Sequence, residues 1–127
     1  MNYLDCCSYE LAKKLSLKEG EFIYVGNDKM HDVRLSNSIH LVPANVVCVA
    51  PTVMEMLNRL PAKLPFKARA TDFECDYSLS IYKIDNDNYE VCYSGLSDAG
   101  NWGPLCEGTF PDALAMLLAY LISTGIV

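Results

Sequence analysis

Residues 73–94 read FECDYSLSIYKIDNDNYEVCYS, and this stretch decides the fold. In its first half, polar residues alternate with apolar ones, namely Phe73, Cys75, Tyr77, Leu79 and Ile81. This period of two is typical of a strand with one face against a core. Asn and Asp at positions 85–88 favour a tight turn and a returning strand. We therefore predict an α+β fold, a two-layer domain whose antiparallel sheet of about four strands is centred on the 73–94 hairpin.

The alternation stops beyond Ile81, where both faces of the predicted hairpin become apolar. If the turn is centred on Asn86 and Asp87, residue 82 opposes residue 91 and residue 84 opposes residue 89. One face would then carry Tyr82, Ile84, Tyr89, Val91 and Tyr93. Tyrosines are enriched at interfaces, so this face is a candidate partner-binding surface. The equally weighted alternative is that both faces of the sheet are covered within the monomer.

The single tryptophan, Trp102, is the second candidate for partner binding. It lies in residues 95–104, which are rich in glycine and other turn formers and predict a loop. An indole exposed in such a loop would be a candidate anchor for a partner. The alternative, which we favour slightly, is that Trp102 closes the edge of the core.

Three helices are expected, near residues 8–18, 52–60 and 110–124. Each begins at a capping residue, and two end at a glycine. The caps are Ser8, Thr52 with Glu55 in a capping box, and Thr109 with Asp112 in another, and the glycines are Gly20 and Gly125. Short strands are expected at 22–25, 66–70 and 105–108, and a short apolar run occupies 45–50. A small irregular hairpin is expected between Lys29 and Pro43, with its second strand at 39–42.

The last helix has no charged residue from position 113 to the end of the chain. A helix that is apolar all round is buried, and fifteen residues fall short of the roughly 20 that span a membrane. We therefore expect no membrane segment. The helix is either central to the core or a subunit interface, and we expect a homodimer.

Length and composition fit a single domain over residues 1–127, because 51% of the residues are hydrophobic and 20% are charged. The first residues lack the basic start and apolar run of a signal peptide, so the six cysteines predict reduced thiols and a cytoplasmic protein. Charge is uneven: residues 1–71 carry +2 and residues 72–127 carry −8. The acidic half predicts no nucleic-acid binding, because that requires cations aligned on phosphates.

Nothing in the sequence predicts a metal, a cofactor or a catalytic residue. Asp85 and Asp87 do not begin a calcium loop, because Glu90 stands where such a loop needs glycine. No Cys-x-x-Cys pair supports zinc, and no Gly-x-Ser-x-Gly motif marks a nucleophile. One catalytic possibility stays open, which is a thiol that lies beside His31 or His40 in the folded chain.

Several segments resemble small uncharacterised proteins of bacteriophages and mobile elements, particularly those of gut Bacteroides. They are SYELAKKL at 8–15, GEF at 20–22, APT at 50–52, SIY at 80–82 and the helix start at 107–115. The resemblance implies an intracellular bacterial or phage setting and brings no catalytic residue with it. The tyrosine face and the uncharged last helix favour the leading hypothesis, which is a non-enzymatic protein-interaction protein of phage or mobile-element origin. The alternatives are an acidic inhibitor or nucleic-acid mimic, and a small Cys-dependent enzyme.

Overall fold

The computed structural model describes residues 5–38, 46–67, 74–95 and 100–127, and all structural statements concern these residues. This part of the chain has three α-helices, α1 (Tyr9–Leu15), α2 (Val53–Arg59) and α3 (Phe110–Ser123), and a short 3-10 helix, η1 (Ser36–Ser38). Its strands are β1 (Phe22–Gly26), β2 (His31–Leu35), β3 (Val46–Val49), β4 (Lys63–Lys67), β5 (Glu74–Lys83), β6 (Tyr89–Ser94) and β7 (Asn101–Gly108).

The predicted four-stranded antiparallel sheet is confirmed, with strand order β4-β5-β6-β7, and so is the α+β class. A second antiparallel sheet, β2-β1-β3, accompanies it. Strand β2 pairs with β1 through the turn at Asn27, and the small hairpin expected between residues 29 and 43 stays a prediction. The strand predicted at 39–42 lies outside the described residues.

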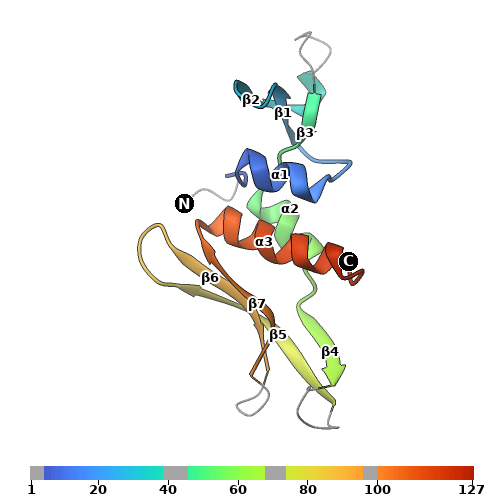
Figure 1. The fold of residues 1–127 in the computed structure, drawn as a ribbon, viewed down its shortest axis with the longest axis vertical. Helices are drawn as coiled ribbons and strands as arrows, with labels where there is room; N and C mark the ends of the chain where they lie inside the picture. The colour runs from blue at the N-terminus through green and yellow to red at the C-terminus, as the bar shows by residue number, and fades with distance from the viewer. Residues whose placement is uncertain (1–4, 39–45, 68–73, 96–99) are drawn as a thin grey trace.

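Helix α3 occupies the centre of the molecule, as Figure 1 shows. One side of α3 contacts β6 and β7, and the other side contacts α1 and α2. The three-stranded sheet lies beyond α1, which contacts β3. An apolar circumference is what a helix needs when protein surrounds it on both sides. The uncharged sequence of α3 is therefore explained within one chain, and the expected homodimer stays a prediction.

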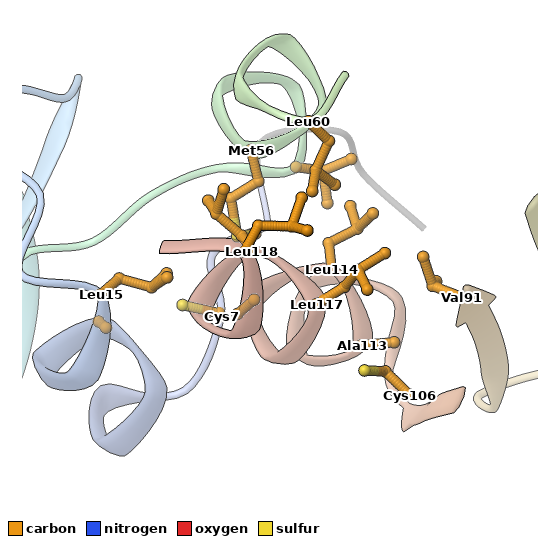
Figure 2. Close-up of a cluster of buried hydrophobic side chains, with 14 of the residues drawn as sticks. Cys7, Leu15, Met56, Leu60, Val91, Cys106, Ala113, Leu114, Leu117 and Leu118 are labelled. Atoms are coloured by element: carbon orange, nitrogen blue, oxygen red, sulfur yellow. The ribbon is translucent and has the colours of Figure 1, made fainter. Parts of the chain in front are cut away.

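The core is built from side chains of α3 that point toward α1 and α2 on one side and toward β6 and β7 on the other. Figure 2 shows Leu114, Leu117 and Leu118 of α3 between α2 and the four-stranded sheet. All three leucines are fully buried, as are Met56 of α2 and Val91 of β6. Close packing of this kind is what aligns the long hairpin β5–β6 with α3.

Helix starts agree with the sequence better than helix ends do. The capping box of Thr52 and Glu55 is present, and the Thr109 hydroxyl caps α3 as predicted. Ser8 stands at the N-cap of α1, but its side chain makes no capping hydrogen bond. Helix α1 ends at Ser16, in the left-handed conformation, and not at Gly20.

Candidate functional site

The predicted register of the central hairpin was wrong by one residue. Strands β5 and β6 pair Tyr82 with Glu90, not with Val91. The turn is centred on Asn86, because the N–H groups of Ile84 and Asp85 both donate to the Asn88 carbonyl, at 2.9 and 3.2 Å. A slip of one residue moves every side chain of one strand to the opposite face relative to those of its neighbour. The five residues predicted on one face are therefore divided between two.

Val91 and Tyr93 lie on the face that packs against α3 and are fully buried. The Tyr93 hydroxyl donates a 2.7 Å hydrogen bond to the Pro61 carbonyl, which satisfies its polar group inside the core. For these two residues the covered-face alternative describes the structure. They cannot contact a partner without unfolding of the sheet.

Tyr89 and Trp102 lie at the boundary between core and surface. The Tyr89 ring stacks on Phe110 at the start of α3, with ring centroids 4.9 Å apart. Trp102 belongs to β7, not to a loop, and meets Tyr93 and Tyr120 edge-on, at 6.4 and 5.7 Å. Because its indole is half-buried against these rings, Trp102 closes the edge of the core in the way the alternative expected.

Tyr82 and Ile84 remain in solvent, 64% and 42% exposed. Ile81, on the other face of the hairpin, is 43% exposed, because α3 packs on β6 and β7 and β5 lies beside them. Sequence reasoning placed Ile81 in the core, since its strand position is the same as that of buried Tyr77. The alternation gives the face of a residue but not which strands the helix covers.

Carboxylates surround these apolar side chains. Glu90 and Glu107 are directly opposite each other on β6 and β7, in the same row as Tyr82. Asp85 and Asp87 lie in the turn, both exposed. Like charges directly opposite on neighbouring strands are destabilising. We call the apolar and acidic residues of this hairpin end the tip surface: Ile81, Tyr82, Ile84, Asp85, Asp87 and Glu107, which are exposed, and Glu90, which is half-buried. Lys83 and Asn86 between them are exposed as well.

A pocket of about 430 Å³ lies beside the tip surface. Three segments that are distant in sequence meet there: the chain before α1, the β5–β6 turn and the start of α3. Its lining residues are Asp5, Cys6, Asn86, Asp87, Tyr89, Thr109, Phe110 and Pro111. Sequence reasoning found only Tyr89 among the candidates, because no local pattern connects residue 5 with residues 87 and 110.

Four of the described thiols, Cys6, Cys7, Cys48 and Cys106, lack the properties of a nucleophile. Burial raises the pKa of Cys6 to about 11, of Cys7 to about 12 and of Cys106 to about 11, and it also raises the pKa of Cys48. The thiolate is the reactive form, so these thiols are protonated and unreactive at neutral pH.

His31, for its part, stacks on the Tyr9 ring at 3.9 Å, and no described hydrogen bond connects it to a thiol. His40 lies outside the described residues. Cys92 of β6 lies opposite Ser80 of β5, and Cys75 of β5 lies opposite Phe66 of β4.

Within residues 5–38, 46–67, 74–95 and 100–127, no three His, Cys, Asp or Glu residues gather closely enough to hold a metal ion. None of the helices in these ranges has the length and apolar character needed to cross a membrane. No family model, curated protein or solved structure matches the chain.

Proposed function

We propose that this chain is a non-enzymatic interaction protein, of phage or mobile-element origin and cytoplasmic, that binds a basic partner protein through the tip surface. The observation that carries the proposal is the exposure of Tyr82 and Ile84 on one face of a hairpin that projects beyond α3, with Ile81 exposed on the other face. Tyrosine and isoleucine supply contact area that gains free energy when a partner covers it. An interface centre surrounded by polar residues has this composition.

The charge of the tip surface indicates what kind of partner it fits. Four carboxylates lie here against one cation, Lys83, which is exposed on the same face of the sheet as Ile81 and has its ammonium over the Tyr89 ring. Glu90 and Glu107 repel each other in the free protein. A basic partner would relieve that repulsion and speed encounter through electrostatic attraction.

Selection of displayed 12-residue random peptides on the immobilised protein tests the proposal. We expect the enriched peptides to combine Lys or Arg with aromatic or aliphatic residues. Their affinity should fall at least tenfold on the double variant Tyr82→Ser, Ile84→Ser. The matched control is Met30→Ser, Val33→Ser, which removes two exposed apolar side chains from the turn before β2 and from β2 itself. Equal affinity for the two double variants, or no enrichment at all, would overturn the proposal.

The acidic inhibitor or nucleic-acid mimic is the second candidate, and the opposed pair Glu90 and Glu107 favours it. A mimic would bind mainly through its carboxylates, so its ligands would be basic without apolar residues. Binding would also weaken steeply with salt, because exposed charges are screened. The salt dependence of the selected peptides separates the two functions: a steep loss between 50 and 300 mM salt, unaffected by Tyr82→Ser, would favour the mimic.

A further inference from the structure

We propose that the pocket beside the tip surface receives one Lys or Arg side chain of the partner. This inference rests on the proposed function and identifies the chemistry of the group that the site recognises. It follows from three features of the pocket: its charge, its aromatic wall and its position.

The charge of the pocket lining is entirely negative. Asp5 and Asp87 contribute carboxylates, and no Lys or Arg lines the pocket. Neither carboxylate forms an ion pair with another described residue, since the pairs in that part of the chain are Lys13 with Asp28 and Arg34 with Asp32. The start of α3 brings its positive helix end to the pocket, but Asp112 in the first turn offsets it. The lining therefore complements a cation.

The wall of the pocket suits an organic cation better than a metal ion. Tyr89 and Phe110 form a stacked aromatic pair there, with an interplanar angle of 26°. Aromatic faces attract ammonium and guanidinium groups and pack against their methylene stems. The volume of about 430 Å³ lies in the range of pockets that hold small ligands and single side chains.

Lys83 gives an internal sign of this preference. Its ammonium lies 5.8 Å from the centroid of the Tyr89 ring, so this ring already attracts a cation from its own chain. Lys83 also adds a positive charge next to the pocket, and this charge repels an incoming cation. Removal of the Lys83 charge should therefore strengthen binding, whereas removal of the Asp87 charge should weaken it.

The position of the pocket matches the proposed interface. Asp87 belongs both to the pocket and to the tip surface, and Asn86 is the centre of the turn. Tyr82 and Ile84 lie on the other face of the sheet from Tyr89, so a partner that covers them would reach this pocket around the turn. Apolar contact at the centre with charged contacts at the rim is the usual division in interfaces.

Titration of the ¹⁵N-labelled full chain with Nα-acetyl-arginine amide tests the pocket without a known partner. We expect millimolar binding with shifts centred on Asn86, Tyr89 and Phe110, and none with the neutral isostere Nα-acetyl-citrulline amide. Asp87→Asn should weaken the affinity about threefold and Lys83→Met should strengthen it about twofold, as expected for single exposed charges. Asp32→Asn, which removes an exposed carboxylate on β2, is the matched control and should change nothing.

Equal shifts with the citrulline probe, or an Asp87→Asn affinity equal to that of Asp32→Asn, would overturn the inference. Its failure is distinguishable from failure of the proposed function. If the selected peptides depend on Tyr82 and Ile84 but bind Asp87→Asn unchanged, the function stands and the pocket assignment falls. If no peptide depends on Tyr82 and Ile84, the function falls, and the arginine probe still tests the pocket alone.

Discussion

The Asp112 carboxylate in the first turn of α3 accepts a 2.7 Å hydrogen bond from the backbone N–H of Ser8, at the N-cap of α1. The sequence predicts a different role for Asp112, as the second half of a capping box with Thr109. Only the first half of that box forms, with the Asp112 N–H donating to the Thr109 hydroxyl at 3.4 Å. Asp112 thus connects the starts of two helices that are a hundred residues apart in sequence.

Replacement of Asp112 by Ala should lower the free energy of unfolding by about 1–2 kcal/mol, because a backbone donor and the positive end of α3 both lose their partner. Asp112→Asn keeps an oxygen acceptor and should cost less. Urea unfolding followed by the fluorescence of Trp102 measures both. Asp87→Ala removes an exposed carboxylate whose side chain has no described hydrogen bond, and should change stability by less than about 0.5 kcal/mol. If Asp112→Ala lowers the free energy of unfolding no more than Asp87→Ala does, the hydrogen bond between the two helix starts contributes nothing to stability.

Leu117 is fully buried at the centre of α3, and its replacement by Ala should cost about 2–5 kcal/mol through lost burial and the cavity left behind. Leu105→Ala on β7 is the matched control, since Leu105 is 49% exposed and should cost under about 1 kcal/mol. Urea unfolding of the two variants gives the comparison. Equal costs would mean that α3 is not the centre of the core.

The sequence predicts the features that depend on residues close together in the chain, and it does not predict those that depend on residues far apart. The Thr52 cap and the alternating strand need only neighbours within a few residues, and both are recognisable in one dimension. The hairpin register depends on the turn, where the Asp85 carboxylate accepts from the Asp87 N–H at 3.1 Å and centres the bend on Asn86. Because the bend is centred on Asn86, Tyr82 opposes Glu90 and lies on the other face of the sheet from Val91. The pocket joins residues 5, 87 and 110, so only the tertiary fold brings it together.

The ionisation of Asp28 should make the free energy of unfolding depend on pH in acid. The Tyr9 hydroxyl and the Lys13 ammonium both donate to its Oδ1, Lys13 at 3.0 Å, and these bonds hold the pKa of Asp28 below its ordinary value of 3.8. The folded state therefore favours the ionised carboxylate. Its contribution to stability is present above about pH 4 and is lost as the pH falls through the lower pKa of the folded state.

Asp28→Asn removes this contribution, so the stability difference between wild type and variant should shrink as the pH falls from 5 to 2.5. Urea unfolding at each pH measures that difference. Asp32→Asn is the control, because Asp32 is an exposed carboxylate paired with Arg34 at a longer distance, 3.4 Å. A difference for Asp28→Asn that stays constant over this range would show that Tyr9 and Lys13 do not favour the charged form.

Two buried tyrosines should make the free energy of unfolding depend on pH in alkali. Tyr24 donates to the Cys7 carbonyl and Tyr93 to the Pro61 carbonyl, each at 2.7 Å, and burial raises the pKa of each to about 12. Between pH 10 and 12 the unfolded chain loses these protons while the folded chain keeps them. Stability should therefore fall as the pH rises through this range, by up to about 1.4 kcal/mol per pH unit for each tyrosine.

Tyr93→Phe separates the hydrogen bond from the titration. At pH 7 the variant should be less stable by about 1 kcal/mol, because the Pro61 carbonyl loses its donor. Between pH 10 and 12 its stability should fall less steeply than that of wild type, because one ionising group is gone. The thiols of the unfolded chain titrate from about pH 9 in both proteins, so their effect on stability cancels in the comparison. Unfolding in urea at pH 7, 10 and 11.5, with phenolate absorbance at 295 nm as a second signal, provides the test. Parallel loss of stability in both proteins would mean that Tyr93 ionises in the folded state as readily as in the unfolded chain.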